Sequence, residues 1–555
     1  MCAFIVNNGR IRRIQISVDY ILSRFQFSSI KLILLVSLFI TILNNQVFFS
    51  KASERLELFS FEGGVYLFTV YTIIFSLLVF VHFVVGQKYL LKALMVLLLL
   101  LSATLSYFNQ ELGVIFDGDM IRNIVETIKD NNKQEAFELL SLPLLKHIFL
   151  YGLLPAFFVL SVKITRRTFV KESLIRAGYG VGLFLLVAAL ILINFKYVTY
   201  FSRENRDLRF YITPLFAVDS LINYQRKEIG SQNIKVKILG DDAVQDKVKT
   251  KRVIGLMVVG ETARGDHFSL NGYARETNPK LKEADVINFT QARSCGTSTA
   301  FSVPCMFSFL GRSDYSPDKA KRETNVLDVL ETAGVKTFWI DNNSSCKGVC
   351  KRIGEVNLRR EPDAQSPFYA DGELFDEVLI TKVDEFLSEH DKESDVLIVL
   401  HTLGSHGPKY YKRYPDEFSK FEPACKKATP QECTDQENVN AYDNTILYTD
   451  HVLSEMIRYL KEKQSESDTF MIYASDHGES LGEKGVYLHG LPYFLAPDAQ
   501  THIPLLAWFS DTFTTKNTEL NKSAANKVSH DNLSHSLLGA FNVKSRVYRK
   551  EYDLF

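Results

Sequence analysis

Thr299 lies between two cysteines in the segment SCGTSTAFSVPC, residues 294–305. A threonine hydroxyl is a poor nucleophile at neutral pH, so an attack on phosphorus requires that a metal ion or a base activate it. If the segment from Ser298 onward opens a helix, its free N–H groups and dipole favour an anion beside this hydroxyl. The ordinary alternative is a Ser/Thr-rich loop that caps a helix.

Residue types that bind metal ions follow two apolar runs. Asp476 and His477 come directly after TFMIYAS in the segment SDHGE, and Glu261 follows VIGLMVVG. Carboxylate and imidazole groups both suit zinc, and zinc lowers the pKa of a bound water to about 7. The same effect on an alcohol predicts a Thr299 alkoxide that forms a covalent phospho-enzyme.

Two further histidines lie in segments rich in glycine. His406 is in HTLGSHGP, residues 401–408, and His489 is in YLHGLPY, residues 487–493. Both are candidates for binding phosphate, for general acid–base catalysis or for a second, weaker zinc ion. His401 ends an apolar strand and is interpreted as a structural residue.

The segment DNNSSCKGVC, residues 341–350, offers a polar donor and a cation. Its Asn343 and Lys347 suit the binding of a phosphate or a lipid head group.

These residues need a scaffold that brings distant segments together. Short apolar runs alternate with helical patterns from residue 252 onward, which favours an α/β domain with a parallel sheet covered on both faces. Sites in such sheets form beyond the carboxyl ends of the strands, where four of the five predicted strands deliver polar residues. The predicted strands are 253–259, 335–340, 395–402, 469–475 and 503–509.

The first 200 residues contain long uncharged runs. A membrane-spanning helix needs about 20 apolar residues, so we predict five spans. The first, residues 32–49, is the weakest because Asn44, Asn45 and Gln46 interrupt it. The other four lie within 62–88, 92–111, 144–163 and 176–196.

Charge predicts the orientation of these spans. The N-terminal tail and the connector 163–176 are basic, so the positive-inside rule places them in the cytoplasm. Five crossings then put the residues after 200 outside. The chain has no net charge, which gives no indication of nucleic-acid binding.

Cysteine spacing agrees with export. Six of the seven cysteines lie beyond residue 290 in three local pairs, and the sequence contains no CxxC motif of the kind that binds zinc. We therefore expect disulfides rather than a zinc cluster. The expected pairs are Cys295 with Cys305, Cys346 with Cys350, and Cys425 with Cys433.

The predicted organisation has three parts. Residues 1–200 form the transmembrane domain, 201–251 an interfacial helix and linker, and 252–555 the zinc-dependent catalytic domain. The interfacial helix is expected over residues 201–235, and the amphipathic segment 111–143 is expected near the catalytic domain, on the outer face of the membrane. The alternative for both segments is a plain connecting helix.

Several long motifs carry a family resemblance. They are VVGETARGDHFSLNGYARETNP (258–279), CGTSTAFSVPCMFS (295–308), HTLGSHGPKYYKRYP (401–415), NAYDNTILYTD (440–450) and SDHGESLGEKGVYLHG (475–490). The chain resembles the lipid A phosphoethanolamine transferases, which include the mobile colistin-resistance enzymes. The resemblance covers nearly the whole chain. It implies five membrane helices followed by a periplasmic α/β/α sandwich of the alkaline phosphatase type, in the bacterial inner membrane.

The resemblance also implies the substrates and the site. The donor is phosphatidylethanolamine, the acceptor is a lipid A phosphate, and the monomeric enzyme lowers polymyxin binding. Thr299 matches the nucleophile, and with Glu261, Asp476 and His477 it matches the ligands of a tight zinc ion. The histidines that match a second-metal or substrate role are His406 and His489, and the residues that match head-group contacts are Thr297, Asn343 and Lys347.

One departure concerns the loop YADGELFDE, residues 369–377. Many relatives carry a cysteine pair here, whereas this chain has Ala370 and Leu374. The loop is therefore expected to lack a bridge.

Other functions remain open. The acceptor can be a core sugar of lipopolysaccharide, although ETAR after the first strand favours the lipid A branch. A membrane-anchored hydrolase of phosphate or sulfate esters would share the fold and the metal. A binding module without chemistry would not need Thr299. A transporter is disfavoured because the predicted spans lack paired charges.

Overall fold

The computed structural model describes residues 3–7, 10–14, 26–56, 61–86, 89–129, 139–165, 167–231, 235–246, 251–360, 362–370, 372–389, 393–513 and 527–555. The chain forms two compact units. The helical unit comprises Met1–Glu111 and Leu142–Asp219, and the sheet unit comprises Leu112–Ser141 and Ser220–Phe555. The predicted boundaries at residues 200 and 251 remain predictions.

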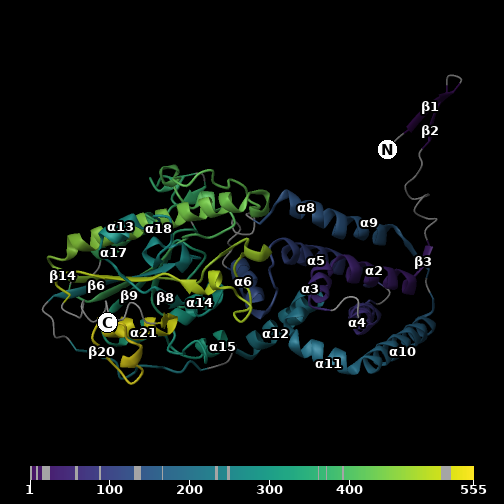
Figure 1. Cartoon of the computed structure of the whole chain (residues 1–555), viewed down its shortest axis with the longest axis horizontal. Helices are drawn as coiled ribbons and strands as arrows, with labels where there is room; N and C mark the ends of the chain where they lie inside the picture. The colour runs from purple at the N-terminus through teal and green to yellow at the C-terminus, as the bar shows by residue number, and fades with distance from the viewer. Residues whose placement is uncertain are drawn as a thin grey trace. The chain divides into compact units, whose positions relative to one another are not determined.

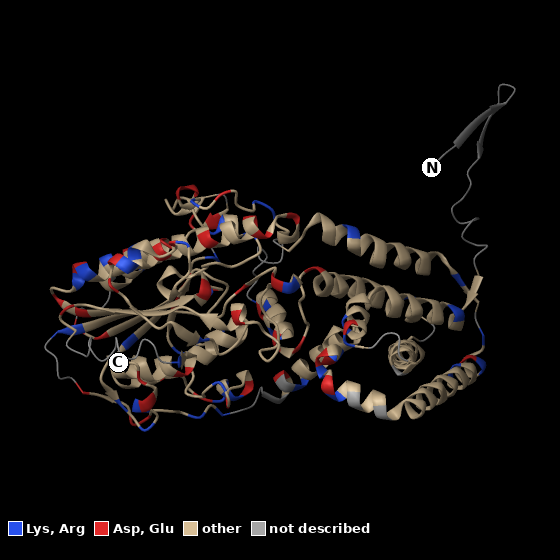
Figure 2. Ribbon diagram, in the orientation of Figure 1, with Lys and Arg blue, Asp and Glu red and all other residues tan. Residues whose placement is uncertain are grey.

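The helical unit contains long apolar helices. Four helical stretches within the described residues are long and apolar enough to cross a membrane, or five if a bent pair forms one span. Figure 2 shows few charged residues along them. They are α4 (Phe61–Val85), α5 (Leu91–Glu111), α8 (Leu142–Ile148) continued through Phe149–Leu153 into α9 (Leu154–Ser161), and α10 (Phe169–Ile193).

The bent pair is the segment that we expected to be the weakest span. Helices α2 (Ser29–Leu43) and α3 (Gln46–Arg55) meet at an angle of 54°. Between them, the Asn45 amide donates hydrogen bonds to the carbonyl oxygens of Ile40 and Thr213, at 3.0 and 2.9 Å. The side chain thus takes over backbone acceptors where the helix is interrupted.

The sheet unit is built on a seven-stranded sheet, visible edge-on in Figure 1. Five neighbouring strands are parallel. In spatial order they are β10 (Gly354–Asn357), β9 (Lys336–Asp341), β13 (Val396–His401), β6 (Arg252–Gly260) and β14 (Ser467–Ser475).

The expectation of an entirely parallel sheet was wrong at its last strand. Strand β18 (Leu505–Phe509) runs antiparallel to β14, and β7 (Ile287–Asn288) runs antiparallel to β18. Ala474 at the end of β14 pairs with Leu505 at the start of β18, so the chain between them stays at one end of the sheet. A parallel arrangement would have required a crossover to the other end.

Both faces of the sheet are covered by helices. Val253, Met257 and Val259 of β6 belong to a core with α14 (Thr299–Met306), α16 (Val326–Thr332) and α21 (Leu533–Ala540). The alternating residues Ile254, Leu256 and Val258 pack into a second core with α13 (Pro279–Glu283), α17 (Val378–Glu389) and α18 (Asp435–Lys463). Burial on both faces explains why the strands are continuous apolar runs, and the unit is an α/β/α sandwich.

The segment expected at the membrane surface belongs to the sheet unit. Asp117 directly precedes its helix α6 (Gly118–Lys129), and Asp117 Oδ1 accepts a hydrogen bond from Met120 N at 2.9 Å. The helix packs against α14, which starts at Thr299. Just before α6, the Leu112 carbonyl accepts a hydrogen bond from Tyr487 N at 3.1 Å. Residues 130–138 of the amphipathic segment lie outside the described residues.

The single interfacial helix expected over 201–235 is divided in the structure. The chain forms α11 (Phe195–Glu204), a 3-10 turn at Arg206–Tyr211 and α12 (Leu215–Ser231). Pro214 stands directly before α12, where its missing N–H costs no hydrogen bond. The following linker contributes a short strand, β5 (Val244–Gln245), which pairs with β20 (Val543–Lys544).

Candidate active site

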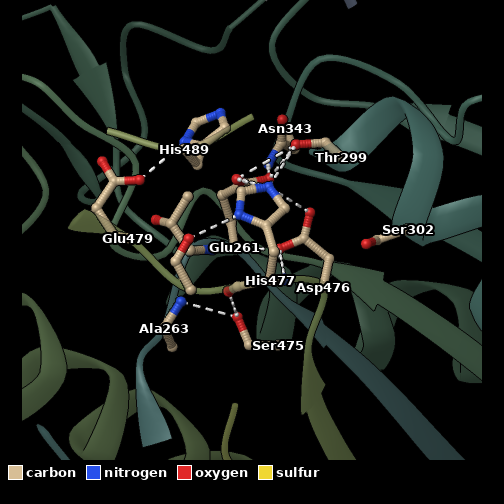
Figure 3. Close-up of polar contacts among 12 residues, drawn as sticks. Glu261, Ala263, Thr299, Ser302, Asn343, Ser475, Asp476, His477, Glu479 and His489 are labelled. Carbon is tan, nitrogen blue, oxygen red and sulfur yellow. Dashed lines mark hydrogen bonds and ion pairs between the residues drawn. The ribbon is translucent and has the colours of Figure 1, made fainter. Parts of the chain in front are cut away.

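Four strands end at one edge of the sheet and deliver the candidate residues. Glu261 follows β6, Asn343 follows β9, His406 lies in the loop after β13, and Asp476 and His477 follow β14. The structure thus brings together residues that are more than 200 positions apart. Figure 3 shows Glu261, Asp476 and His477 grouped below Thr299.

The hydroxyl of Thr299 lies within a buried polar group. Its Oγ1 is 3.2 Å from Glu261 Oε2 and 3.4 Å from His477 Nε2. His477 Nε2 is in turn 3.2 Å from Asp476 Oδ2 and 3.5 Å from Glu261 Oε1. Thr299 is 5% exposed, Glu261 1%, and Asp476 and His477 are fully buried. The four predicted zinc ligands therefore lie together.

The donor set fits a divalent cation. His477 Nδ1 lies 2.9 Å from the Gly478 carbonyl, which can only accept, so the ring's Nε2 is unprotonated and turns a lone pair toward two carboxylates. Asp476 Oδ2 has no hydrogen-bond partner among the described residues. Three acceptors that face one another in a buried site require a positive charge between them. Nitrogen and carboxylate ligands favour zinc.

Burial also shifts the acidity of these groups. It raises the pKa of Glu261 well above its usual value, and the charge of Asp476 adds to this effect. Burial raises the pKa of Asp476 to about 6 and lowers the pKa of His477 far below its usual range. All three shifts arise because the charged forms of these groups are poorly solvated. A bound cation would stabilise the charged form of the two carboxylates.

Thr299 is the first residue of α14, as the sequence predicted for a helix start. Ser298 precedes it in an extended conformation, with φ −147° and ψ 147°. The unpaired N–H groups of the first turn therefore lie beside the Thr299 hydroxyl, where an anionic phosphate is favoured. The Cys295–Cys305 disulfide closes the segment around this helix start.

Asn343 lies closer to the metal ligands than its expected role as a head-group contact implies. Its amide nitrogen donates to Glu261 Oε2 and to the Thr402 carbonyl, both at 2.9 Å. Its own backbone N–H donates to Asp341 Oδ1 at 2.8 Å. Asn343 thus holds the Glu261 carboxylate in place, a contact that no spacing in the sequence indicates.

The other two predicted head-group contacts make local hydrogen bonds. Thr297 Oγ1 donates to the Leu491 carbonyl at 2.6 Å, and Lys347 Nζ donates to Ser344 Oγ at 2.7 Å. Lys347 stands between the bridged Cys346 and Cys350 with a positive φ of 49°. Their roles toward a substrate remain predictions.

The paired histidines lie beside the ligand set. The ring of His489 is 4.4 Å from that of His477 and 5.8 Å from that of His406, measured between centroids. His489 Nδ1 is 2.8 Å from Glu479 Oε2, and Tyr410 donates to Glu479 Oε1 at 2.8 Å. Sequence reasoning missed Glu479, although it stands in the SDHGE motif two positions after His477.

Two acidic residues in the loop 369–377, Glu373 and Asp376, position the chain around His406. Asp376 accepts hydrogen bonds from Leu403 N and Gly404 N, at 2.8 and 2.9 Å. Glu373 lies 3.2 Å from Arg413, whose Nε donates to the His406 carbonyl at 2.7 Å. The sequence did not indicate either contact.

The structure also tests the predictions for His401 and for the cysteines. His401 is buried with Nδ1 3.1 Å from Asp341 Oδ2, in agreement with a structural role. The third expected bridge, Cys425–Cys433, is present with the other two. Cys2 lies outside the described residues.

Comparison with known proteins agrees with this architecture. The sulfatase family matches residues 255–543, and the phosphoethanolamine transferase EptA/EptB family matches residues 74–229. The phosphoethanolamine transferase EptA of Escherichia coli K12 is 35% identical over 551 residues, covering 96% of this chain and 98% of that protein. The phosphatidylethanolamine transferase Mcr-1 of Escherichia coli is 35% identical over 533 residues, covering 94% and 96%.

A solved structure covers the same length. The integral membrane protein lipooligosaccharide phosphoethanolamine transferase A from Neisseria meningitidis superimposes with a TM-score of 0.90 at 35% identity, over 96% of this chain and 99% of that one. A sulfatase-type sheet unit joined to apolar helices defines a membrane enzyme of the alkaline phosphatase fold class. Within that class, the chain belongs to the phosphoethanolamine transferase family of the EptA and Mcr proteins.

Proposed function

We propose that the chain transfers phosphoethanolamine from phosphatidylethanolamine to a phosphate of lipid A through a phosphothreonine at Thr299. The observation that carries the proposal is the position of Thr299 Oγ1, which is 3.2 Å from Glu261 and 3.4 Å from His477 at the start of α14. No structural role explains why a threonine hydroxyl should lie among buried groups of this kind.

Glu261, Thr299, Asp476 and His477 would hold a zinc ion, which would supply Lewis acidity that lowers the pKa of the Thr299 hydroxyl. In the first step, Thr299 Oγ1 forms a bond to the donor phosphorus and the bond from phosphorus to the diacylglycerol oxygen breaks. The hydroxyl proton passes toward Glu261, the nearest carboxylate, 3.2 Å away. The helix start favours the phosphate at this position.

The departing diacylglycerol oxygen needs a proton. The contact of His489 Nδ1 with Glu479 would stabilise a protonated ring that donates this proton, and His406 lies next to it. In the second step, a phosphate oxygen of lipid A bonds to the phosphorus and the bond to Thr299 Oγ1 breaks. Thr299 Oγ1 regains its proton from Glu261, the attacking phosphate hydroxyl of the acceptor gives its own proton to His489, and the enzyme returns to its starting state. A second, weaker zinc ion at the two histidines is the alternative role for this pair.

The setting of the reaction follows from the helical unit. We propose five crossings of the bacterial inner membrane, with the sheet unit in the periplasm and the chain acting as a monomer. Donor, acceptor and enzyme then share one membrane. The added ammonium group offsets phosphate charge, so cationic peptides such as polymyxin bind the product surface less strongly.

The match to the sulfatase family supports a second candidate. A hydrolase of phosphate or sulfate esters would use the same metal ligands and Thr299, with water as the final acceptor. Release of free phosphoethanolamine without modification of lipid A would favour it. Transfer to a core sugar is the second alternative, and it would place the added mass outside lipid A.

Intact-mass analysis of the purified enzyme tests the proposal. Incubated with phosphatidylethanolamine alone, the wild type should gain one phosphoethanolamine on Thr299. Thr299→Ala should fold, keep its three disulfides, gain no mass and lose lipid A modification by about a thousandfold or more. Thr299→Ser is the matched control, because it keeps a hydroxyl and should retain part of the activity. Lipid A modification by Thr299→Ala at the wild-type rate would exclude a phosphothreonine.

A further inference from the structure

A cavity of about 390 Å³ lies along α14 within the sheet unit. Ala300 and Pro304 form its wall on α14, Arg122 contributes from α6, and Pro317 and Ala320 contribute from α15 (Pro317–Ala320). Both α6 and α15 pack against α14, and the three helices lie close together in Figure 1. The metal ligands Glu261, Asp476 and His477 are not part of this cavity, which shares Lys347 with the candidate active site.

The lining of the cavity is strongly basic. Three acidic residues, Glu126, Glu228 and Glu323, face six cations. The six cations are Arg122, Lys321, Arg322, Lys347, Lys351 and Arg352.

Part of this positive charge has no partner among the residues that the structure describes. Lys321 pairs with Glu228 at 3.0 Å, and Arg352 pairs with Asp328. Arg322 and Lys351, by contrast, make no ion pair or side-chain hydrogen bond with any residue that the structure describes. A hollow whose cations outnumber its carboxylates suits a phosphate group of a ligand.

Arg122 supplies an independent observation. The residue is 6% exposed, and its guanidinium lies 3.2 Å from Asp119 and 3.9 Å from Asp318. Its Nε is buried and has no hydrogen-bond partner in the described parts of the chain. A buried donor without an acceptor is costly, so a ligand oxygen in the cavity would satisfy it.

The cavity begins next to the nucleophile. Ala300 is the residue after Thr299, and Pro304 lies one turn further, at a rise of about 6 Å along the helix. One molecule can therefore reach both places. Phosphatidylethanolamine has a single phosphate, which must lie at Thr299 during its own reaction. The acceptor lipid A carries more than one phosphate, so only the acceptor has a second one to place.

We propose that this cavity binds a second phosphate of the acceptor while the reacting phosphate attacks at Thr299, a proposal that rests on the function proposed above. The cavity thereby selects acceptors with two phosphates over acceptors with one. Its cations Arg322 and Lys351 act in the second step of the reaction, whereas formation of the phosphothreonine from the donor does not use them.

Charge reversal at the two unpaired cations tests this inference. The double variant Arg322→Glu/Lys351→Glu of the full-length enzyme is assayed in phosphatidylethanolamine vesicles with bisphosphorylated or monophosphorylated lipid A. Its KM for the bisphosphorylated acceptor should rise about fivefold to tenfold, as expected for two exposed charge contacts. Its KM for the monophosphorylated acceptor and its release of diacylglycerol without acceptor should equal those of the control.

The control is Lys282→Glu/Lys426→Glu, which changes the net charge equally at exposed cations outside the cavity. Equal effects of the test variant on both acceptors, or no effect on either, would overturn the proposal. Slower release of diacylglycerol would assign the cavity to the donor and also overturn it. Failure of the wild type to modify either acceptor would instead contradict the proposed function.

Adding phosphatidylglycerol tests whether the phosphate bound in the cavity belongs to the acceptor or to an anionic membrane lipid. Under the proposal, adding this lipid to the vesicles leaves the wild-type preference for the bisphosphorylated acceptor unchanged. If it abolishes the preference in the wild type, an anionic phospholipid occupies the cavity and the proposal is wrong.

Discussion

The arrangement of Glu261, Asp476 and His477 lowers the folding stability of the protein when no cation is bound. Their acceptor atoms face one another in a fully buried place, and Asp476 Oδ2 has no hydrogen-bond partner among the described residues. Thr299 and Asn343 each offer one hydrogen to Glu261, which satisfies that side chain only in part. At the scale of single residues, this arrangement supports the proposed cation and activated hydroxyl, because it does not favour folding.

Glu479 provides the first prediction at this scale. Because its carboxylate holds His489 Nδ1, Glu479→Gln should leave the ring less well oriented and less basic, and transfer should fall by about tenfold to a hundredfold. Steady-state kinetics should show the loss in kcat rather than in KM. Tyr410→Phe is the control, since it removes a hydroxyl from the other oxygen of Glu479 and should cost less. Equal losses in the two variants would mean that the carboxylate has no special role toward His489.

At the scale of elements, loops at the carboxyl edge of the sheet determine where the site residues point. The loop before His406 is held through backbone N–H groups by Asp376, and Arg413 holds the His406 carbonyl. Relatives of this family are expected to stiffen the neighbouring loop 369–377 with a cysteine pair. This chain instead buries Glu373, with 1% of its surface exposed, between Arg413 and Arg359.

The second prediction concerns this buried ion pair. Glu373→Ala leaves the buried Arg413 and the partly buried Arg359 without their carboxylate, so the sheet unit should lose about 3 kcal/mol of unfolding free energy. Urea unfolding followed by tryptophan fluorescence measures this directly, because Trp339 and Trp508, the only two tryptophans of the chain, both lie in the sheet unit.

The matched control is Glu385→Ala, which removes an exposed partner of Lys382 and should change stability by less than about 0.5 kcal/mol. A Glu373→Ala variant as stable as this control would show that the disulfide-free loop does not depend on the ion pair.

At the scale of the whole molecule, the proposed metal site predicts that metal binding is coupled to folding. A cation that binds only the folded sheet unit stabilises it by about 2.7 kcal/mol when present at a hundredfold excess over its Kd. Zinc should therefore raise the melting temperature of the metal-free wild type, and chelation should lower it. Metal analysis of the purified protein should find zinc together with this shift.

Asp476→Asn distinguishes a metal site from a structural cluster. Without metal, the variant should melt at or above the metal-free wild type, because it removes one of two buried carboxylates that face each other. With zinc, it should bind less metal and show a smaller shift. A metal-free variant that melts well below the metal-free wild type would mean that Asp476 serves the fold and not a cation.

Local patterns in the sequence were sufficient for several features of the structure. Continuous apolar runs predicted the central strands, and polar residues directly after them predicted which side chains meet at one edge. The pairs of nearby cysteines predicted the three disulfides, because short loops leave few alternatives. The interruption at Asn44, Asn45 and Gln46 marked the place where the first apolar segment bends.

Other features depend on contacts between distant segments and were decided only by the tertiary structure. Strand β18 is antiparallel because its connection from β14 stays at the active-site end of the sheet. The apolar composition of the strand does not indicate its direction. Asn343 meets Glu261, and Glu479 meets His489, through loops whose paths depend on the packed sheet. The segment around α6 belongs to the sheet unit because it packs against α14. Local patterns could not predict this contact, since α14 lies about 180 residues away along the chain. Composition and spacing determine which chemistry the chain can perform, whereas long-range packing determines which side chains orient it.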